Sequence, residues 1–255
     1  MNKFLLAVAL CGFSRAATAQ SSPNDQPQVD PEQNDFTTGT SILPRGHFQI
    51  ESVFSNSRSG FDRQVRLGDT LVRVPVSENL EVRAMLPAYI YQGNLERTSG
   101  LDDADLGARL RLKSRGKADF ALTFDSKLPT GSRRIAERRF QPEAILAANF
   151  TLSSHTQFSL NAGVGCPTVN GERFTQALGS AEVSFDATPK LNAFFEVYGL
   201  NRAEAGGPSK QFAAGGLIFR INSQTALYGN VGSRLGNHAD GPERFYSLGL
   251  ARLFR

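Results

Sequence analysis

The sequence lacks the features that mark several common classes of protein. Its 255 residues contain two cysteines, Cys11 and Cys166, and no tryptophan. No run after residue 20 approaches the roughly 20 apolar residues that a membrane-spanning helix needs. Basic residues barely outnumber acidic ones, 28 against 24, and no basic run is interleaved with aromatic residues. We therefore exclude a helical membrane protein, a disulfide-rich scaffold and a typical nucleic-acid-binding protein.

The first 19 residues have the features of a signal peptide. Lys3 supplies a positive charge, residues 4–13 form a short apolar run, and Ala17-Thr18-Ala19 fits the small-x-small cleavage pattern. We expect export with cleavage after Ala19. Without the leader, Cys166 is the only cysteine, so the exported protein has no internal disulfide and must be stable by another route.

Residues 20–35 differ in composition from the rest of the chain. They are rich in Ser, Pro, Asn, Asp and Gln and offer little apolar surface to bury. Such segments do not gain enough from burial to offset the entropy of ordering. We therefore expect a flexible periplasmic lead-in over residues 20–35 and a folded domain over residues 36–255.

The stretch 106–128 has the clearest periodicity in the chain. Leu106 and Leu110 alternate with Gly107 and Arg109, and a second run of the same period follows a turn. Neighbouring side chains of a strand point to opposite faces, so this pattern predicts a β-hairpin with one apolar and one charged face. A soluble sandwich would bury the apolar face. An outer-membrane barrel would give that face to lipid and turn the charged face to its lumen.

Similar patterns recur along the chain and predict about twelve strands, at 47–56, 67–75, 80–91, 105–113, 118–129, 143–152, 156–165, 175–186, 191–200, 211–221, 224–235 and 244–254. The connections between them alternate between long and short. The long ones are 57–66, 92–104, 130–142, 166–174, 201–210 and 236–243. This alternation is typical of bacterial barrels with long external loops and short periplasmic turns. The fold class predicted is all-β: a single antiparallel transmembrane β-barrel with an even number of strands, about 12. A sandwich stays open if the chosen strand boundaries created the alternation.

The last predicted strand ends on an aromatic residue, Phe254, followed by Arg255. Such an ending is similar to the signal read by the barrel-assembly machinery. A long apolar edge strand would be an aggregation hazard, and closure onto the first strand would remove it. Closure would also pair the backbone groups and so stabilise a protein without disulfides.

Alternation also predicts which side chains face the lumen, if Leu106, Leu110 and Phe124 face lipid. One interpretation is a cationic stripe that attracts anionic solutes, including aromatic carboxylates. The alternative is a structural lattice of Arg and Glu that fills or shapes the lumen. The lumen-facing candidates are Arg73, Glu81, Arg83, Arg109, Arg111, Asp125, Lys127, Glu143 and Glu196, together with Glu51, Lys113 and Asn149.

The histidines carry little signal. His47, His155 and His238 are far apart in the sequence, and no two have metal-ligand spacing. His238 lies near Asp240 and Ser233 and could begin a hydrolase triad on an outer rim, but a solvated loop histidine explains the same pattern. We expect no catalytic residues.

Asp102, Asp103 and Asp105 could hold a divalent cation outside the membrane. A solvated acidic loop is the simpler interpretation of these three residues. We therefore expect no metal site and no cofactor.

Several short motifs, in their order along the chain, resemble one known family. They are Asp35-Phe36-Thr37-Thr38-Gly39-Thr40, the segment 43–51, Leu106-Gly107, Leu128-Pro129-Thr130-Gly131-Ser132, Phe195-Glu196 and the segment 215–222. They are similar to the barrel family labelled "putative MetA-pathway of phenol degradation". The resemblance implies a porin-like outer-membrane barrel, sometimes called a transporter, and does not establish phenol chemistry here.

Together these observations predict a porin-like channel for small solutes, with aromatic or anionic compounds as candidates, in the outer membrane of a Gram-negative bacterium. The alternatives are a non-conducting structural or surface-interaction barrel and a barrel-embedded hydrolase. We expect no enzymatic activity. The expected partners are outer-membrane lipid, the barrel-assembly machinery and a small-molecule solute, with no nucleic acid.

Overall fold

The computed structural model describes residues 27–33, 35–60, 62–93, 97–112, 114–236 and 243–255. The signal-peptide prediction, residues 20–26, Lys113, His238 and Asp240 lie outside this part of the chain. All regular elements in the described residues are strands, and among them no helix could cross a bilayer.

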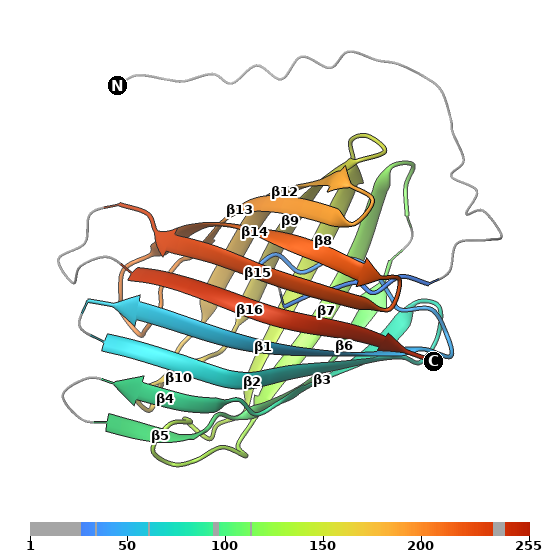
Figure 1. Ribbon diagram of the computed structural model, residues 1–255. Coiled ribbons are helices and arrows are strands. Elements are labelled where there is room, and N and C mark those ends of the chain that lie inside the picture. Colours follow the sequence, from blue (N-terminus) through green and yellow to red (C-terminus); the bar gives the residue numbers. More distant parts are fainter. Residues whose placement is uncertain (1–26, 34, 61, 94–96, 113, 237–242) are drawn as a thin grey trace, which may run out of the picture.

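Fourteen strands form one antiparallel sheet, which closes because β1 pairs with both β2 and β16 (Figure 1). A separate short hairpin consists of β10 (Thr168–Val169) and β11 (Glu172–Arg173). The strands of the closed sheet are β1 (Phe48–Ser59), β2 (Asp62–Pro75), β3 (Leu80–Leu86), β4 (Tyr89–Gly93), β5 (Arg97–Leu101), β6 (Ala104–Arg111), β7 (Ala118–Leu128), β8 (Gln141–Thr151), β9 (Thr156–Gly165), β12 (Gln176–Thr188), β13 (Leu191–Leu200), β14 (Lys210–Asn222), β15 (Thr225–Arg234) and β16 (Glu243–Phe254).

Two positions in the barrel wall are each filled by two short strands. β2 pairs with β3 through residues 70–75 and with β4 through residues 63–67, so β3 and β4 continue one another along the same neighbour. The break between them contains Pro87, which cannot donate a ladder hydrogen bond. β5 and β6 continue one another in the same way across Asp102 and Asp103. The wall therefore has twelve positions, and the predicted closed twelve-stranded barrel is confirmed.

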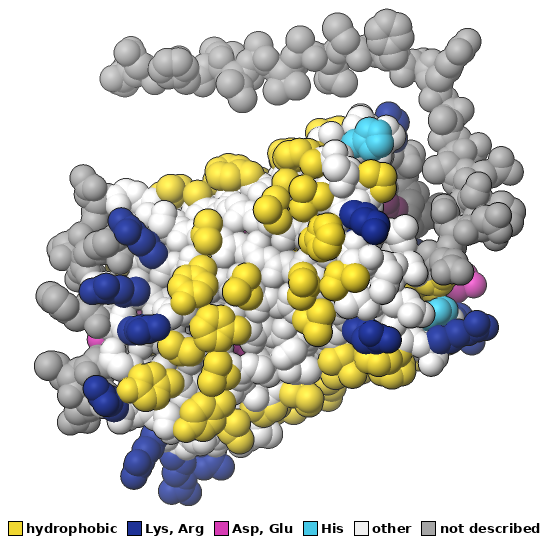
Figure 2. Space-filling model, viewed as in Figure 1, with side chains coloured by type: hydrophobic (Ala, Val, Ile, Leu, Met, Phe, Trp, Pro, Cys, Tyr) yellow, Lys and Arg dark blue, Asp and Glu magenta, His cyan; other side chains and the backbone are white. Residues whose placement is uncertain are grey.

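The two faces of the wall differ as the alternation predicts. Leu110, Leu122 and Phe124 are 43%, 42% and 50% exposed on the outside, whereas Arg109 and Thr123 are buried inside. Figure 2 shows the apolar side chains gathered in a band across the strands, with Lys and Arg toward both ends of the barrel. An apolar exterior and a charged interior are the reverse of a soluble protein and suit a barrel surrounded by lipid.

Phenylalanine rings border the apolar band at the end where the chain terminates. Phe48 stacks on Phe254, with ring centroids 4.9 Å apart. Phe150 contacts Phe120 and Phe158 at 6.4 and 6.2 Å. Aromatic residues of this kind form the girdles of outer-membrane barrels at the membrane interface. This chain builds such a border without tryptophan.

The connections sort to the two ends of the barrel as expected, but two are shorter than predicted. The short turns after β2, β6, β8, β12 and β14 lie at one end, here the short-turn end, together with Phe254. The predicted loops 57–66 and 92–104 are wrong in extent, because β1 and β2 continue to Ser59 and Asp62 and because β4 and β5 form a hairpin. These extensions are polar, and since ladder hydrogen bonds need no apolar side chain, the periodicity does not reveal them.

The sorting of connections gives a testable orientation. We expect Ala205→Cys, in the connection after β13, to react with an impermeant maleimide on intact cells, and Ser114→Cys to react only after the outer membrane is opened. Both residues are exposed, and Cys166 is first replaced by Ser. Long connections face outward in this class of barrel. Labelling at Ser114 but not at Ala205 would invert the orientation.

The described part of the expected flexible lead-in packs against the inner face of the barrel wall. Residues 27–33 and 35–43, here the lumen insert, lie inside the barrel, and the exposed turn at residues 44–46 leads from it to β1. Val29 is 1% exposed, and its backbone N–H donates to the carbonyl of Ser223 at 2.7 Å. The segment has little apolar surface of its own, but the barrel wall supplies the partners that composition cannot show.

Candidate functional site: the filled lumen

The lumen insert enters and leaves at the same end of the barrel. It begins beside Ser223, in the turn after β14. The backbone N–H of Phe36 then donates to both carboxylate oxygens of Glu196, midway along β13, at 3.0 and 3.1 Å. The backbone N–H of Leu43 donates to Glu81, at the start of β3, at 3.0 Å. The insert therefore turns back near Phe36 and occupies the short-turn half of the lumen.

Three arginines of the wall converge on one carboxylate of the insert. Oε1 of Glu32 lies 3.3 Å from Nη2 of Arg73. Oε2 of Glu32 lies 2.7 Å from Nη1 of Arg83 and 2.6 Å from Nη2 of Arg109. Nε of Arg73 also donates to Oε1 of Glu81 at 2.8 Å. Buried charges are tolerated only when they are paired and hydrogen-bonded, and these groups satisfy that condition together. The arrangement favours the lattice interpretation over an open cationic stripe.

A second wall carboxylate holds the backbone of the insert. Oε2 of Glu51 accepts hydrogen bonds from the backbone N–H groups of Glu32 at 2.8 Å and Gln33 at 3.2 Å. The hydroxyl of Tyr228 donates to the same oxygen at 3.3 Å. Asp30 is fixed through Gln49, which accepts from its N–H at 2.9 Å and donates to its carbonyl at 2.6 Å. The insert is therefore anchored through its main chain as well as through Glu32.

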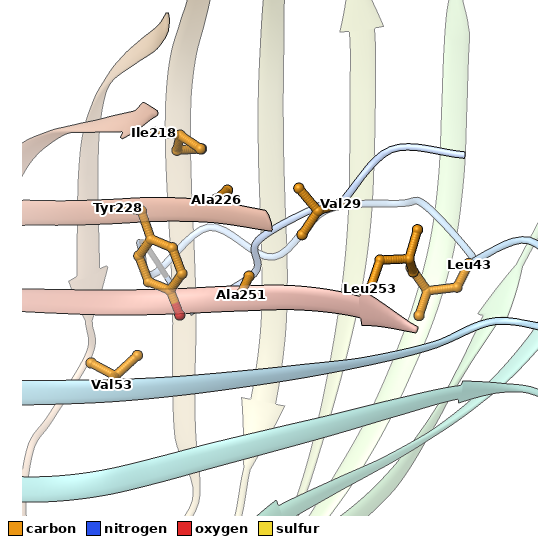
Figure 3. Packing of buried hydrophobic residues seen from close by; sticks show 8 residues of the cluster. All are labelled: Val29, Leu43, Val53, Ile218, Ala226, Tyr228, Ala251 and Leu253. Atoms are coloured by element: carbon orange, nitrogen blue, oxygen red, sulfur yellow. The ribbon is translucent and has the colours of Figure 1, made fainter. Parts of the chain in front are cut away.

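The opposite side of the insert is apolar. Val29 and Leu43 pack in a buried cluster with Val53 of β1 and with residues of β14, β15 and β16. Figure 3 shows the two insert residues beside Leu253 and Ala251, with Tyr228 further along the wall. These wall residues point into the lumen. They are buried from solvent because the insert covers them.

Four aromatic rings meet at the tip of the insert. Phe36 stacks on Tyr198 of β13 with centroids 4.2 Å apart and planes at 8°. Tyr198 stacks in turn on Phe212 of β14 at 4.9 Å and 14°, and Phe212 contacts Phe245 of β16 at 6.4 Å. This aromatic stack was not predicted from the sequence. The signal was available, because alternation from Glu196 places Tyr198 on the lumen face.

The comparisons with known proteins agree with this architecture. Residues 32–248 match the family described as "Putative MetA-pathway of phenol degradation". The chain belongs to this family. The match confirms the resemblance in the sequence, and its first residue is Glu32, the carboxylate that binds the three arginines. No curated protein matches the chain.

Three solved structures show the same fold at low sequence identity. The COG4313 outer membrane channel from Pseudomonas putida F1 has a TM-score of 0.69 and 13% identity, over 89% of this chain and all of that one. The NanC porin has a TM-score of 0.57 and 8% identity, over 80% and 98%. The KdgM porin, in complex with disordered oligogalacturonate, has a TM-score of 0.57 and 9% identity, over 81% of this chain and 99% of that one. The fold of this family member is that of outer-membrane channels and porins.

The remaining predicted lumen residues lie inside the barrel but in different places. Arg111 does not join the cluster around Glu32 and lines a cavity of about 610 Å³ at the short-turn end. Asp125, Lys127 and Glu143 line another cavity of about 210 Å³, on the far side of Arg83. Both Glu51 and Glu196 contact the insert, and Asn149 lines the larger cavity.

Asp102 and Asp103 are neither solvated nor arranged around a cation. Asp102 pairs with Arg66 at 2.9 Å and with Lys127 at 3.5 Å. Asp103 is 3% exposed and accepts hydrogen bonds from the backbone N–H groups of Gly131 and Arg138 at 2.8 and 3.0 Å. Asp103 fastens the connection after β7 to the break between β5 and β6, and Asp102 ties the same break to β2 and β7. The expectation of a solvated acidic loop is therefore wrong for Asp102 and Asp103.

Proposed function

We propose that the protein is a channel, and not an enzyme, through which small solutes cross the outer membrane of a Gram-negative bacterium. The observation that carries the proposal is a barrel with an apolar outer face whose lumen holds a non-covalent insert. Support comes from the relatives of the same fold, one an outer membrane channel and two of them porins. The apolar band would contact outer-membrane lipid, and the strand ending in Phe254 would be read by the barrel-assembly machinery. Export would include cleavage after Ala19.

The insert forms the barrier in this proposal. Arg83 lines the cavity of about 210 Å³, and Glu32 lines the cavity of about 610 Å³. Their ion pair, 2.7 Å long, stands between the two spaces. A solute would therefore pass only when the contacts of Glu32 with the wall are broken or rearranged. Since those contacts are ionic and hydrogen-bonded, an anionic solute could compete for the same guanidinium groups.

The aromatic stack supports aromatic compounds as solutes. Ring faces attract other rings in offset or edge-on arrangements, with a gain of about 0.5–1.5 kcal/mol beyond area burial. The rings of Tyr198, Phe212 and Phe245 line the lumen wall next to the tip of the insert. A planar solute could exchange stacking partners with Phe36 as it passes.

The test is solute flux into liposomes that contain the purified protein. We expect Tyr198→Ala to reduce uptake of benzoate roughly two- to tenfold, the rate equivalent of one lost stacking contact, and to leave uptake of a non-aromatic carboxylate of similar size unchanged or faster. Tyr246→Ala, on the exposed outer face, is the matched control and should change neither. Equal loss for both solutes would refute an aromatic preference.

The filled lumen also favours one alternative, a barrel that conducts nothing and serves a structural role. Planar-bilayer recordings separate the two functions. Openings of the parent protein support the channel. A complete lack of conductance, both in the parent and after neutralisation of Glu32, would assign the structural role.

A further inference from the structure

The tip of the insert meets an acidic wall across the lumen from the arginines. Glu182 of β12 and Glu196 of β13 are cross-strand partners. Asp35, Glu182 and Glu196 each place one carboxylate oxygen within 4.8 Å of those of the other two residues. Around the barrel, β7–β9 separate β12 from the arginine-bearing strand β6. Like charges on directly paired strand positions destabilise a sheet unless something compensates them.

The side chains of Asp35 and Glu182 are hydrogen-bonded to one another, but the described residues supply no cationic partner for the cluster. No Lys or Arg in the described ranges forms an ion pair with Glu182 or Glu196. Glu196 accepts hydrogen bonds from the backbone of Phe36 and Thr37. Glu182 is 8% exposed, and its Oε2 has no hydrogen-bond partner within the described structure. A buried carboxylate oxygen without a partner carries a full desolvation penalty, which a bound cation would remove.

We propose that Asp35, Glu182 and Glu196 bind a hard divalent cation, Ca²⁺ or Mg²⁺, that fastens the insert to the barrel wall. Ca²⁺ in proteins takes six to eight oxygen ligands, with carboxylates prominent among them. The three carboxylates come from three separate segments, so a shared ion joins them. The hydroxyls of Thr37 and Ser180 lie 2.9 Å apart beside Glu196 and add neutral oxygens.

The site has a route to solvent. Asp35, Thr37 and Glu182 all line the cavity of about 610 Å³ at the short-turn end. The cation can therefore enter and leave without unfolding of the wall. The inference is independent of whether the barrel conducts, because it concerns only the attachment of the insert.

The test is equilibrium dialysis of the purified full-length protein in detergent against ⁴⁵Ca²⁺, after removal of metal with a chelator. We expect one saturable site with a dissociation constant of roughly 10⁻⁴–10⁻³ M, the range of extracellular calcium modules. Glu182→Gln should weaken binding at least tenfold. Glu143→Gln, which neutralises a carboxylate in the other cavity, should leave it unchanged. Equal binding by parent and Glu182→Gln, or no saturable binding by the parent, would overturn the proposal.

Two further measurements keep the result interpretable. A folded barrel migrates faster on a gel before heating than after heating, and this difference will show that each variant is folded. If Glu182→Gln does not fold, Glu182→Asp takes its place and should retain part of the parent's affinity. In crystals soaked in Mn²⁺, an anomalous peak among the three carboxylates supports the site. If the carboxylates instead share a proton, stability rises as the pH falls and Ca²⁺ has no effect, which rejects the cation.

Discussion

Glu32→Gln is expected to release the lumen insert and to raise single-channel conductance. The substitution leaves Arg73, Arg83 and Arg109 without their common carboxylate, although Glu81 still pairs with Arg73. Removal of one partner of a buried ion pair typically costs 3–5 kcal/mol, because the charge left behind is uncompensated. Departure of the insert lets water reach the guanidinium groups and relieves that cost. The open state is therefore favoured.

The same variant should also shift ion selectivity toward anions. Three arginines that lose their counter-charge give the lumen a positive potential, and a confined lumen screens charge less than open water does. The reversal potential in a salt gradient measures this shift, which should shrink as screening shortens to about 3 Å at 1 M salt.

Glu143→Gln is the matched control for Glu32→Gln. It makes the same chemical change on the lumen wall, at a residue that forms no ion pair within the described residues. It should leave conductance near the parent value. Unchanged conductance of Glu32→Gln together with a large loss of thermal stability would mean that the arginine cluster has only a structural role. That result would contradict the insert as the barrier to solute passage.

Leu110→Arg is expected to destabilise the barrel by about 2–4 kcal/mol, the cost of an arginine on the lipid face near the bilayer midplane. Leu110 pairs with Leu122, which lies at the middle of β7, and both are exposed on the outer face. A guanidinium there must lose water or draw water into the hydrocarbon. Reversible unfolding into liposomes with urea measures the difference in the free energy of unfolding.

Leu112→Arg provides the depth control for this prediction. Leu112 lies on the same face, nearer the short-turn end, where the cost of a charge falls to roughly 0–1 kcal/mol. Thr123, on the opposite face, is unsuitable as a mild control because it is 2% exposed and accepts a hydrogen bond from Nε of Arg109 at 3.1 Å. Equal costs at positions 110 and 112 would contradict a membrane around this band.

The local sequence was sufficient to predict the barrel wall. Period-two alternation places Leu110 and Arg109 on opposite faces, and each strand has only two faces to choose between. Turn residues and loop lengths then order the strands, and a closed sheet with sequential neighbours follows from the need to pair every edge. The breaks at Pro87 and at Asp102, and the polar extensions of β1 and β2, were missed because ladder hydrogen bonds are independent of side-chain polarity.

Only the tertiary structure decided what fills the lumen. Residues 27–33 look like a disordered linker, since Glu32 and Val29 have no partner within reach along the sequence. Their partners lie on β2, β3, β6 and β14–β16, which closure of the barrel brings around a single space. Alternation assigns a side chain to the lumen but not to a neighbour across it. The sequence by itself therefore determined a barrel with a charged interior, and long-range packing decided that these charges are paired and that the interior is partly apolar and occupied by the insert.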